Sequence, residues 1–136
     1  MPLHRILIVD DQQNWRDVIS SLLASDGYEV NSVASTADAW RLLDNKSFDI
    51  AILDVRLVDD DPFDVQGIEL LEQMKTRLGD RFPIVIMTGY SFEGLEKNVS
   101  NRYGVKAFLH KGSGKLRNIK EFRSLIKNLL ANAEND

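Results

Sequence analysis

The sequence predicts an α/β fold in which one five-stranded parallel sheet carries helices on both faces. Short apolar runs, bounded by polar residues, recur along the chain and alternate with segments of helical periodicity. Strands that are buried on both faces of a parallel sheet are typically continuous apolar runs of this kind. Since crossovers are right-handed and the common five-stranded order is 2-1-3-4-5, we expect that doubly wound order here.

The first half of the chain supplies three strand patterns and two helical ones. Residues 5–10 are an apolar run that ends in acid, and a helical pattern follows until Gly27 supplies a stop. Residues 28–33 alternate apolar with polar, as an exposed or edge strand does. Ser35 is expected to cap the next helix at its N-terminus. Residues 49–54 are a short buried strand that ends in a carboxylate.

The second half continues the alternation. Residues 55–66 lack periodicity and are expected to form a loop before a helix. Residues 83–87 form a fourth strand, a helix is expected up to Tyr103, and residues 105–110 form the fifth strand. Two helices are expected to turn apolar residues inward: the helix that Gly67 leads into, with Leu71, Met74 and Leu78, and the last helix, with Ile119, Phe122, Ile126 and Leu129.

Length and composition are those of a single globular domain. The chain has 136 residues, of which 43% are hydrophobic and 28% charged. It contains no apolar stretch of membrane-spanning length, and no signal peptide opens it. The absence of cysteine excludes disulfides and thiolate metal sites and is compatible with a reducing cytoplasm. We expect one cytoplasmic domain over residues 1–131, followed by a polar tail over residues 132–136 that frays.

Charge is unevenly distributed. Residues 1–92 contain 8 Lys and Arg against 16 Asp and Glu, whereas residues 93–136 contain 9 against 5. Either the terminal helix simply presents solvated basic residues, or an acidic site is segregated from a basic surface that faces a partner. The chain as a whole is too acidic to suggest general nucleic-acid binding.

Polar residues end four of the expected strands. Asp10 and Asp11 follow the first strand, Asp54 the third, Thr88 the fourth and Lys111 the fifth. In an open parallel sheet these ends share one edge. In the order 2-1-3-4-5, strands 1 and 3 flank the point where connections leave in opposite directions, which is where ligands bind. Three carboxylates, one hydroxyl and one ammonium are therefore expected to meet in one crevice.

This set of groups is typical of phosphoryl transfer. Three carboxylates repel one another unless a cation intervenes, and hard oxygen ligands in an open cleft suit Mg²⁺, which takes only one or two protein carboxylates. One carboxylate is then left to react, and a carboxylate nucleophile can form an acyl phosphate. Mg²⁺, Lys111 and the Thr88 hydroxyl with nearby N–H groups could each take one phosphoryl oxygen.

Four segments, each at the end of an expected strand, occur in order along the chain: Ile-Leu-Ile-Val-Asp10-Asp11, Ile-Leu-Asp54, Ile-Val-Ile-Met-Thr88-Gly89 and Gly104-Val-Lys-Ala-Phe108-Leu-His-Lys111. With these segments, the sequence resembles along nearly its whole length the receiver domains of two-component response regulators, which have a flavodoxin-like fold. The resemblance implies that Asp54 takes a phosphoryl group from a phosphohistidine on a sensor histidine kinase or a histidine phosphotransfer protein. The chain would then be a receiver with no attached output domain.

The resemblance also assigns roles to the neighbours of Asp54. Asp10 and Asp11 would hold Mg²⁺ together with Asp54 and the backbone carbonyl of Arg56. Thr88 and Phe108 would form a switch pair, in which the hydroxyl moves toward the phosphoryl group and the aromatic ring follows inward. The change would shift the population between two packings and alter the surface formed by helix 4, strand 5 and helix 5. A downstream effector protein, rather than nucleic acid or a membrane, would bind that surface.

Two features depart from the family pattern. Gly112 follows Lys111 where the family usually has proline, so the peptide bond between them is expected to be trans. The loop that follows Asp54 is several residues longer than usual and carries an acidic run over residues 59–61. We expect this run to be solvated; the alternative is a second metal site or a contact with a partner. Arg56 and Tyr90 occupy variable positions that tune the lifetime of the phosphoryl group in this family.

Each assignment has a simpler alternative. Asp10 and Asp11 could cap the first helix, and Asp54 could cap a helix or a turn. Lys111 could be a solvated strand-end residue, Thr88 a loop hydroxyl and Phe108 part of the core.

Two other functions compete. One is a metal-dependent phosphatase or phosphotransferase with an aspartyl nucleophile. Such enzymes generally place a second Asp two residues after the nucleophile, but Gln12 and Arg56 stand there in this chain. The other is a degenerate receiver that acts only as a docking module. It would lack the acceptor, a metal-binding acid or the lysine, and all of these are present. We therefore expect a signalling protein rather than a turnover enzyme.

Overall fold

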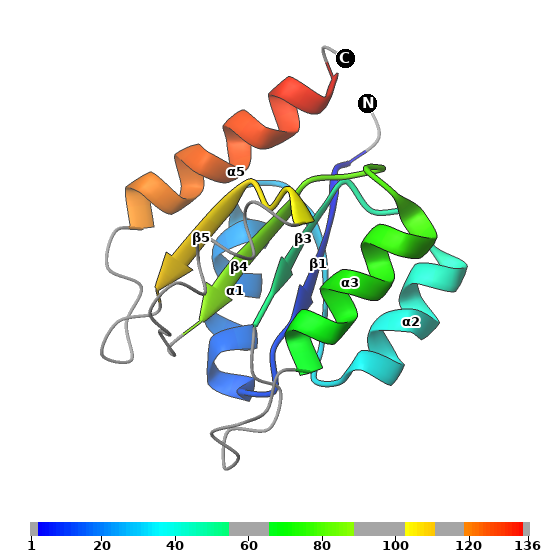
Figure 1. Cartoon of the computed structure of the whole chain (residues 1–136). Coiled ribbons are helices and arrows are strands. Elements are labelled where there is room, and N and C mark those ends of the chain that lie inside the picture. Colours follow the sequence, from blue (N-terminus) through cyan, green and yellow to red (C-terminus); the bar gives the residue numbers. More distant parts are fainter. Residues whose placement is uncertain (1–2, 55–65, 89–102, 111–118, 135–136) are drawn as a thin grey trace.

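The computed structural model describes residues 3–54, 66–88, 103–110 and 119–134. Its sheet has five strands in the order β2-β1-β3-β4-β5, and every pairing is parallel (Figure 1). The predicted fold class and strand order are thus confirmed. The strands are β1 (Arg5–Val9), β2 (Glu29–Val33), β3 (Ile50–Leu53), β4 (Ile84–Thr88) and β5 (Ala107–His110).

Helices cover both faces of this sheet (Figure 1). On one face, α1 (Gln13–Ser25) and α5 (Ile119–Glu134) pack over a core cluster that includes Trp15 and Phe122. On the other, α2 (Thr36–Asn45) and α3 (Gln66–Leu78) pack over a second cluster. None of the described helices is both long enough and apolar enough to cross a membrane.

The central strands are apolar because both of their faces are covered. In β1, Ile6 and Ile8 belong to the cluster under α1 and α5, whereas Leu7 and Val9 belong to the cluster under α2 and α3. All four are buried. The alternating strand β2 lies at the edge of the sheet, as its pattern predicts.

The predicted helix signals are confirmed at two positions. The Ser35 hydroxyl accepts a hydrogen bond of 3.2 Å from the Asp38 N–H, so Ser35 caps α2. After α1, Gly27 adopts a φ of 95° while its N–H donates to the Ala24 carbonyl at 3.0 Å. A left-handed residue at this point ends a helix and satisfies one of its last carbonyl groups.

The last helix differs from its prediction in two respects. The buried row of α5 is Phe122, Ile126 and Leu130, whereas Ile119 is 50% exposed. Ile119 is the first residue of the helix and lies ahead of the row that meets the sheet. The helix also continues to Glu134, into the segment expected to fray, since alanine-containing sequence there favours helix.

Two further predictions meet the structure only in part. The fifth strand starts at Ala107 rather than at residue 105. In α3, Leu71 and Met74 are buried as expected, whereas Leu78 is half-buried. The expected loop, apart from residue 66, and most of the expected fourth helix lie outside the described residues.

Candidate functional site

The carboxyl ends of β1 and β3 are adjacent. Val9 and Leu53 are partners in the sheet register, so the next residue of each chain segment is an aspartate at the same level. The Asp54 N–H donates to the Val9 carbonyl at 2.9 Å, and the Asp10 N–H donates to the Val33 carbonyl at 3.0 Å. The backbone of both acids is therefore fixed by hydrogen bonds that continue the sheet.

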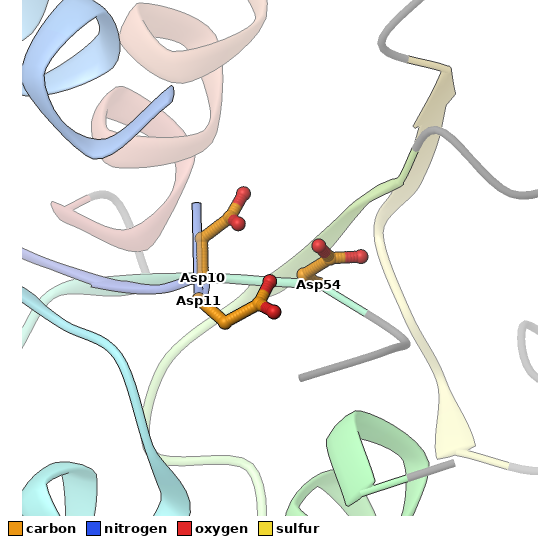
Figure 2. A group of neighbouring side chains, drawn as sticks. All are labelled: Asp10, Asp11 and Asp54. Atoms are coloured by element: carbon orange, nitrogen blue, oxygen red, sulfur yellow. The ribbon is translucent and has the colours of Figure 1, made fainter. Parts of the chain in front are cut away.

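Three carboxylates meet at this edge. Asp10, Asp11 and Asp54 each offer an oxygen atom, and these oxygens all lie within 4.8 Å of one another (Figure 2). Asp10 is 5% exposed and Asp54 4%, and they are the charged residues classed as buried in the described part of the chain. Burial of an ionised carboxylate costs several kcal/mol unless other groups compensate it. The predicted meeting of these three acids is thus seen in the structure.

The donor set suits a hard divalent cation. All three groups are carboxylates, and Mg²⁺ prefers oxygen ligands, of which the protein usually supplies only a few. Because like charges at this separation repel, a bound cation would lower the electrostatic energy of the group. The three acids therefore fit a Mg²⁺ site.

Asp10 also serves the helix that follows it. Its Oδ1 accepts a hydrogen bond of 2.9 Å from the Gln12 N–H, and Gln12 is the N-cap residue of α1 without a side-chain capping bond of its own. The simpler interpretation of Asp10, as a residue that ties down the helix start, is therefore partly correct. It does not exclude metal binding, because a carboxylate has about four acceptor positions.

Sequence reasoning missed Arg16. This residue lies on α1, and its Nη1 donates to the Asp10 carbonyl at 2.7 Å. The signal that could have found it is the position of the charge: α1 has no acid in its first turn and carries an arginine as its fourth residue. A cation is disfavoured near the N-terminus of a helix, so this arginine calls for another explanation.

The other predicted residues are described only in part. Thr88 is the last residue of β4, and the structure describes its backbone but not its side chain. Phe108 of β5 is in register with Ile86, is half-buried and packs against the core cluster under α2 and α3. Several residues lie outside the described ranges altogether: Arg56, Lys111, Gly112, Tyr90 and the acidic residues of the loop after Asp54.

Comparison with known proteins identifies the family. The sequence model of the protein family described as the response regulator receiver domain matches residues 6–127. Among curated proteins, the regulatory protein VirG of Rhizobium radiobacter is 28% identical over 93% of this chain, and AtoC of Escherichia coli is 32% identical over 65%. The chain spans 43% and 18% of the length of these two relatives.

Solved structures agree. A CheY-like response regulator receiver domain protein from Methanospirillum hungatei is 32% identical, with a TM-score of 0.80 and 98% of each chain covered. TrrA from Thermotoga maritima, solved in complex with Mg²⁺-BeF, has the same fold, with 24% identity, a TM-score of 0.75 and coverage of 93% of this chain and 99% of its own. With a sheet of order β2-β1-β3-β4-β5 and acids at the ends of β1 and β3, this chain belongs to the response regulator receiver domain family of two-component signalling.

Proposed function

We propose that this receiver domain accepts a phosphoryl group on Asp54 from a phosphohistidine, with Mg²⁺ present. The donor would be a sensor histidine kinase or a histidine phosphotransfer protein. One observation carries the proposal: the carboxylates of Asp10, Asp11 and Asp54 gather within 4.8 Å at the carboxyl edge of the sheet. Such a cluster is unfavourable for the metal-free fold, and it is the arrangement that a cation-assisted transfer needs.

The positions of the acids suggest which one reacts. Asp10 Oδ1 is tied to the start of α1 through the Gln12 N–H, which favours a holding role for Asp10. Asp54 directly follows the last residue of β3, between the crossovers that leave β1 and β3 in opposite directions, which is the position where ligands bind in such sheets. An Asp54 oxygen would bond to phosphorus while the donor's P–N bond breaks and its electron pair returns to the imidazole.

Asp10 and Asp11, with Asp54 and the Arg56 carbonyl, would hold Mg²⁺. When bound, the cation supplies positive charge to the phosphoryl oxygens. TrrA, which has the same fold, is known in complex with Mg²⁺-BeF, and this supports the choice of metal. Lys111 would bind a second phosphoryl oxygen, and the Thr88 hydroxyl a third.

The signal would pass through a change of packing. Thr88 and Phe108 are the proposed switch pair, and Phe108 is half-buried against the core cluster under α2 and α3. The affected surface would comprise the fourth helix expected from the sequence, β5 and α5, and a downstream effector protein would bind it. We propose a signalling role in the cytoplasm rather than turnover of external substrates, with residues 1–131 as the functional unit.

The test is phosphorylation by a small acyl phosphate. Acetyl phosphate with Mg²⁺ should add one phosphoryl group, seen by intact mass, and Asp54→Asn should prevent it. Asp49→Asn is the matched control, because Asp49 directly precedes the same strand at its other end and accepts from the Arg5 N–H. An unmodified wild-type mass would contradict the proposal. Sustained hydrolysis of a phosphate ester would instead favour the phosphatase alternative.

A further inference from the structure

Arg16 reaches from α1 back to the loop that carries two of the acids. Its Nη1 donates to the Asp10 carbonyl at 2.7 Å. This carbonyl belongs to the peptide group that joins Asp10 to Asp11. Because a peptide group is planar, a bond to its oxygen fixes the plane from which the Asp11 backbone continues.

The other hydrogen bonds of this loop act on different groups. The Asp10 N–H bonds to Val33, and the Asp10 side chain bonds to the Gln12 N–H. The first fixes the peptide before Asp10 and the second fixes the start of α1. The bond from Arg16 acts on the peptide between the two acids, where a rotation would move the Asp11 carboxylate relative to Asp10 and Asp54.

The position of Arg16 is costly for its own helix. It is the fourth residue of α1, within about the first turn, where the helix macrodipole disfavours a cation. Natural proteins break such local preferences mainly at functional sites, where another interaction compensates the cost. Here the compensating interaction is the charge-assisted hydrogen bond to the Asp10 carbonyl, which is shorter and stronger than a neutral one.

We propose that Arg16 is a positioning residue that holds the Asp10–Asp11 peptide in the orientation that binds Mg²⁺. The inference rests on the proposed function, because it concerns the same acids. The effect that it predicts for Mg²⁺ affinity on loss of Arg16 is opposite to the effect of removing a positive charge. Loss of a cation near an acidic cluster would by itself strengthen Mg²⁺ binding, whereas loss of the peptide's orientation weakens it.

The experiment is a calorimetric Mg²⁺ titration of the whole chain. Arg16→Met keeps much of the side-chain length but removes the charge and the donors, and it should raise the Kd for Mg²⁺ roughly three- to tenfold. Arg16→Lys keeps a charged donor and should recover part of the affinity. Arg41→Met is the matched control, because Arg41 is exposed on α2 and bonds to Asp38, so the same change of net charge should leave the Kd unaltered.

A second measurement needs no metal. The Gln12 N–H bonds to the Asp10 side chain, so its amide hydrogen exchange reports the order of the same loop. Arg16→Met should accelerate this exchange, whereas Arg41→Met should not. If Arg16→Met fails to fold, Arg16→Gln, which keeps a neutral donor, carries the same two measurements. An unchanged or tighter Kd in these Arg16 variants, beside a wild type that binds Mg²⁺ and is phosphorylated, would overturn the role of Arg16 alone. A wild type that does neither would overturn this inference together with the proposed function.

Discussion

The charged residues at the two ends of the strands are arranged differently. At the carboxyl ends, the like-charged Asp10, Asp11 and Asp54 gather within 4.8 Å of one another. At the amino ends, charges of opposite sign meet, because Arg5 Nε donates to Glu29 Oε2 at 2.9 Å. Both groups lie on the same sheet, so the fold as such does not require carboxylates to cluster.

The amino-end network satisfies its members locally. Besides Glu29, the Arg5 guanidinium bonds to the Ser47 carbonyl at 3.0 Å, and the Arg5 N–H bonds to Asp49 Oδ2 at 2.7 Å. These bonds tie the start of β1 to β2 and to the segment before β3. Opposite charges that are paired in this way add modest stability, whereas clustered like charges are costly and are kept for what they bind. We therefore interpret the paired charges at the amino ends as structural and the clustered acids at the carboxyl ends as functional.

The largest expected effect is at the carboxyl edge. Asp11→Asn removes one charge of the cluster and should weaken Mg²⁺ binding by roughly a hundredfold. Loss of a residue that only orients a metal ligand already costs about tenfold or more in affinity, and Asp11 is proposed to be a ligand itself. The same change should raise the free energy of unfolding of the metal-free protein by about 1 kcal/mol, because repulsion falls. Urea unfolding with and without Mg²⁺ measures both. If the metal-free variant were less stable than the wild type, the three acids would not destabilise the fold, and the contrast between the two ends of the strands would be wrong.

At the amino ends of the strands, we expect a substitution to lower stability without changing Mg²⁺ binding. Arg5→Met removes the bonds to Glu29 and Ser47 and should lower the free energy of unfolding by about 1–2 kcal/mol. Its Kd for Mg²⁺ should stay that of the wild type, because the change lies at the other end of β1. The urea midpoint and a Mg²⁺ titration decide the outcome. Weakened Mg²⁺ binding would show that the two ends are coupled.

The sequence predicts the functional edge better than the structural details. Asp10 and Asp54 could be placed together because the apolar runs before them establish a parallel sheet, whose topology brings these ends side by side. Ile119 was misplaced because the rotation of α5 about its axis depends on where the helix meets the sheet. The bond from Arg16 depends on a side-chain reach that periodicity does not contain.

Contacts between distant residues are also beyond such reasoning. Asp26 and Arg123 lie 97 positions apart, and no motif links them, yet they form a two-point ion pair in which Arg123 Nε donates to Asp26 Oδ2 at 2.9 Å. The pair joins the loop after α1 to α5. It belongs to the structural class of charges, since its partners have opposite sign.

The smallest expected effect tests that classification through pH. The hydrogen bond from Arg123 lowers the pKa of Asp26 below its usual value. A carboxyl with a depressed folded-state pKa stabilises the protein above its unfolded pKa of about 3.9, and this contribution is lost as the pH falls through the lower folded value.

Asp26→Asn should therefore be less stable than the wild type at neutral pH, and the difference should shrink below about pH 4. Arg123→Met should behave alike, and the double variant should be hardly worse than either single one, because both remove the same interaction. Thermal unfolding between acid and neutral pH gives the comparison. A difference that persists undiminished in acid would mean that Asp26 stabilises the protein by something other than its charge, and the ion pair would then not belong with the paired charges of the amino edge.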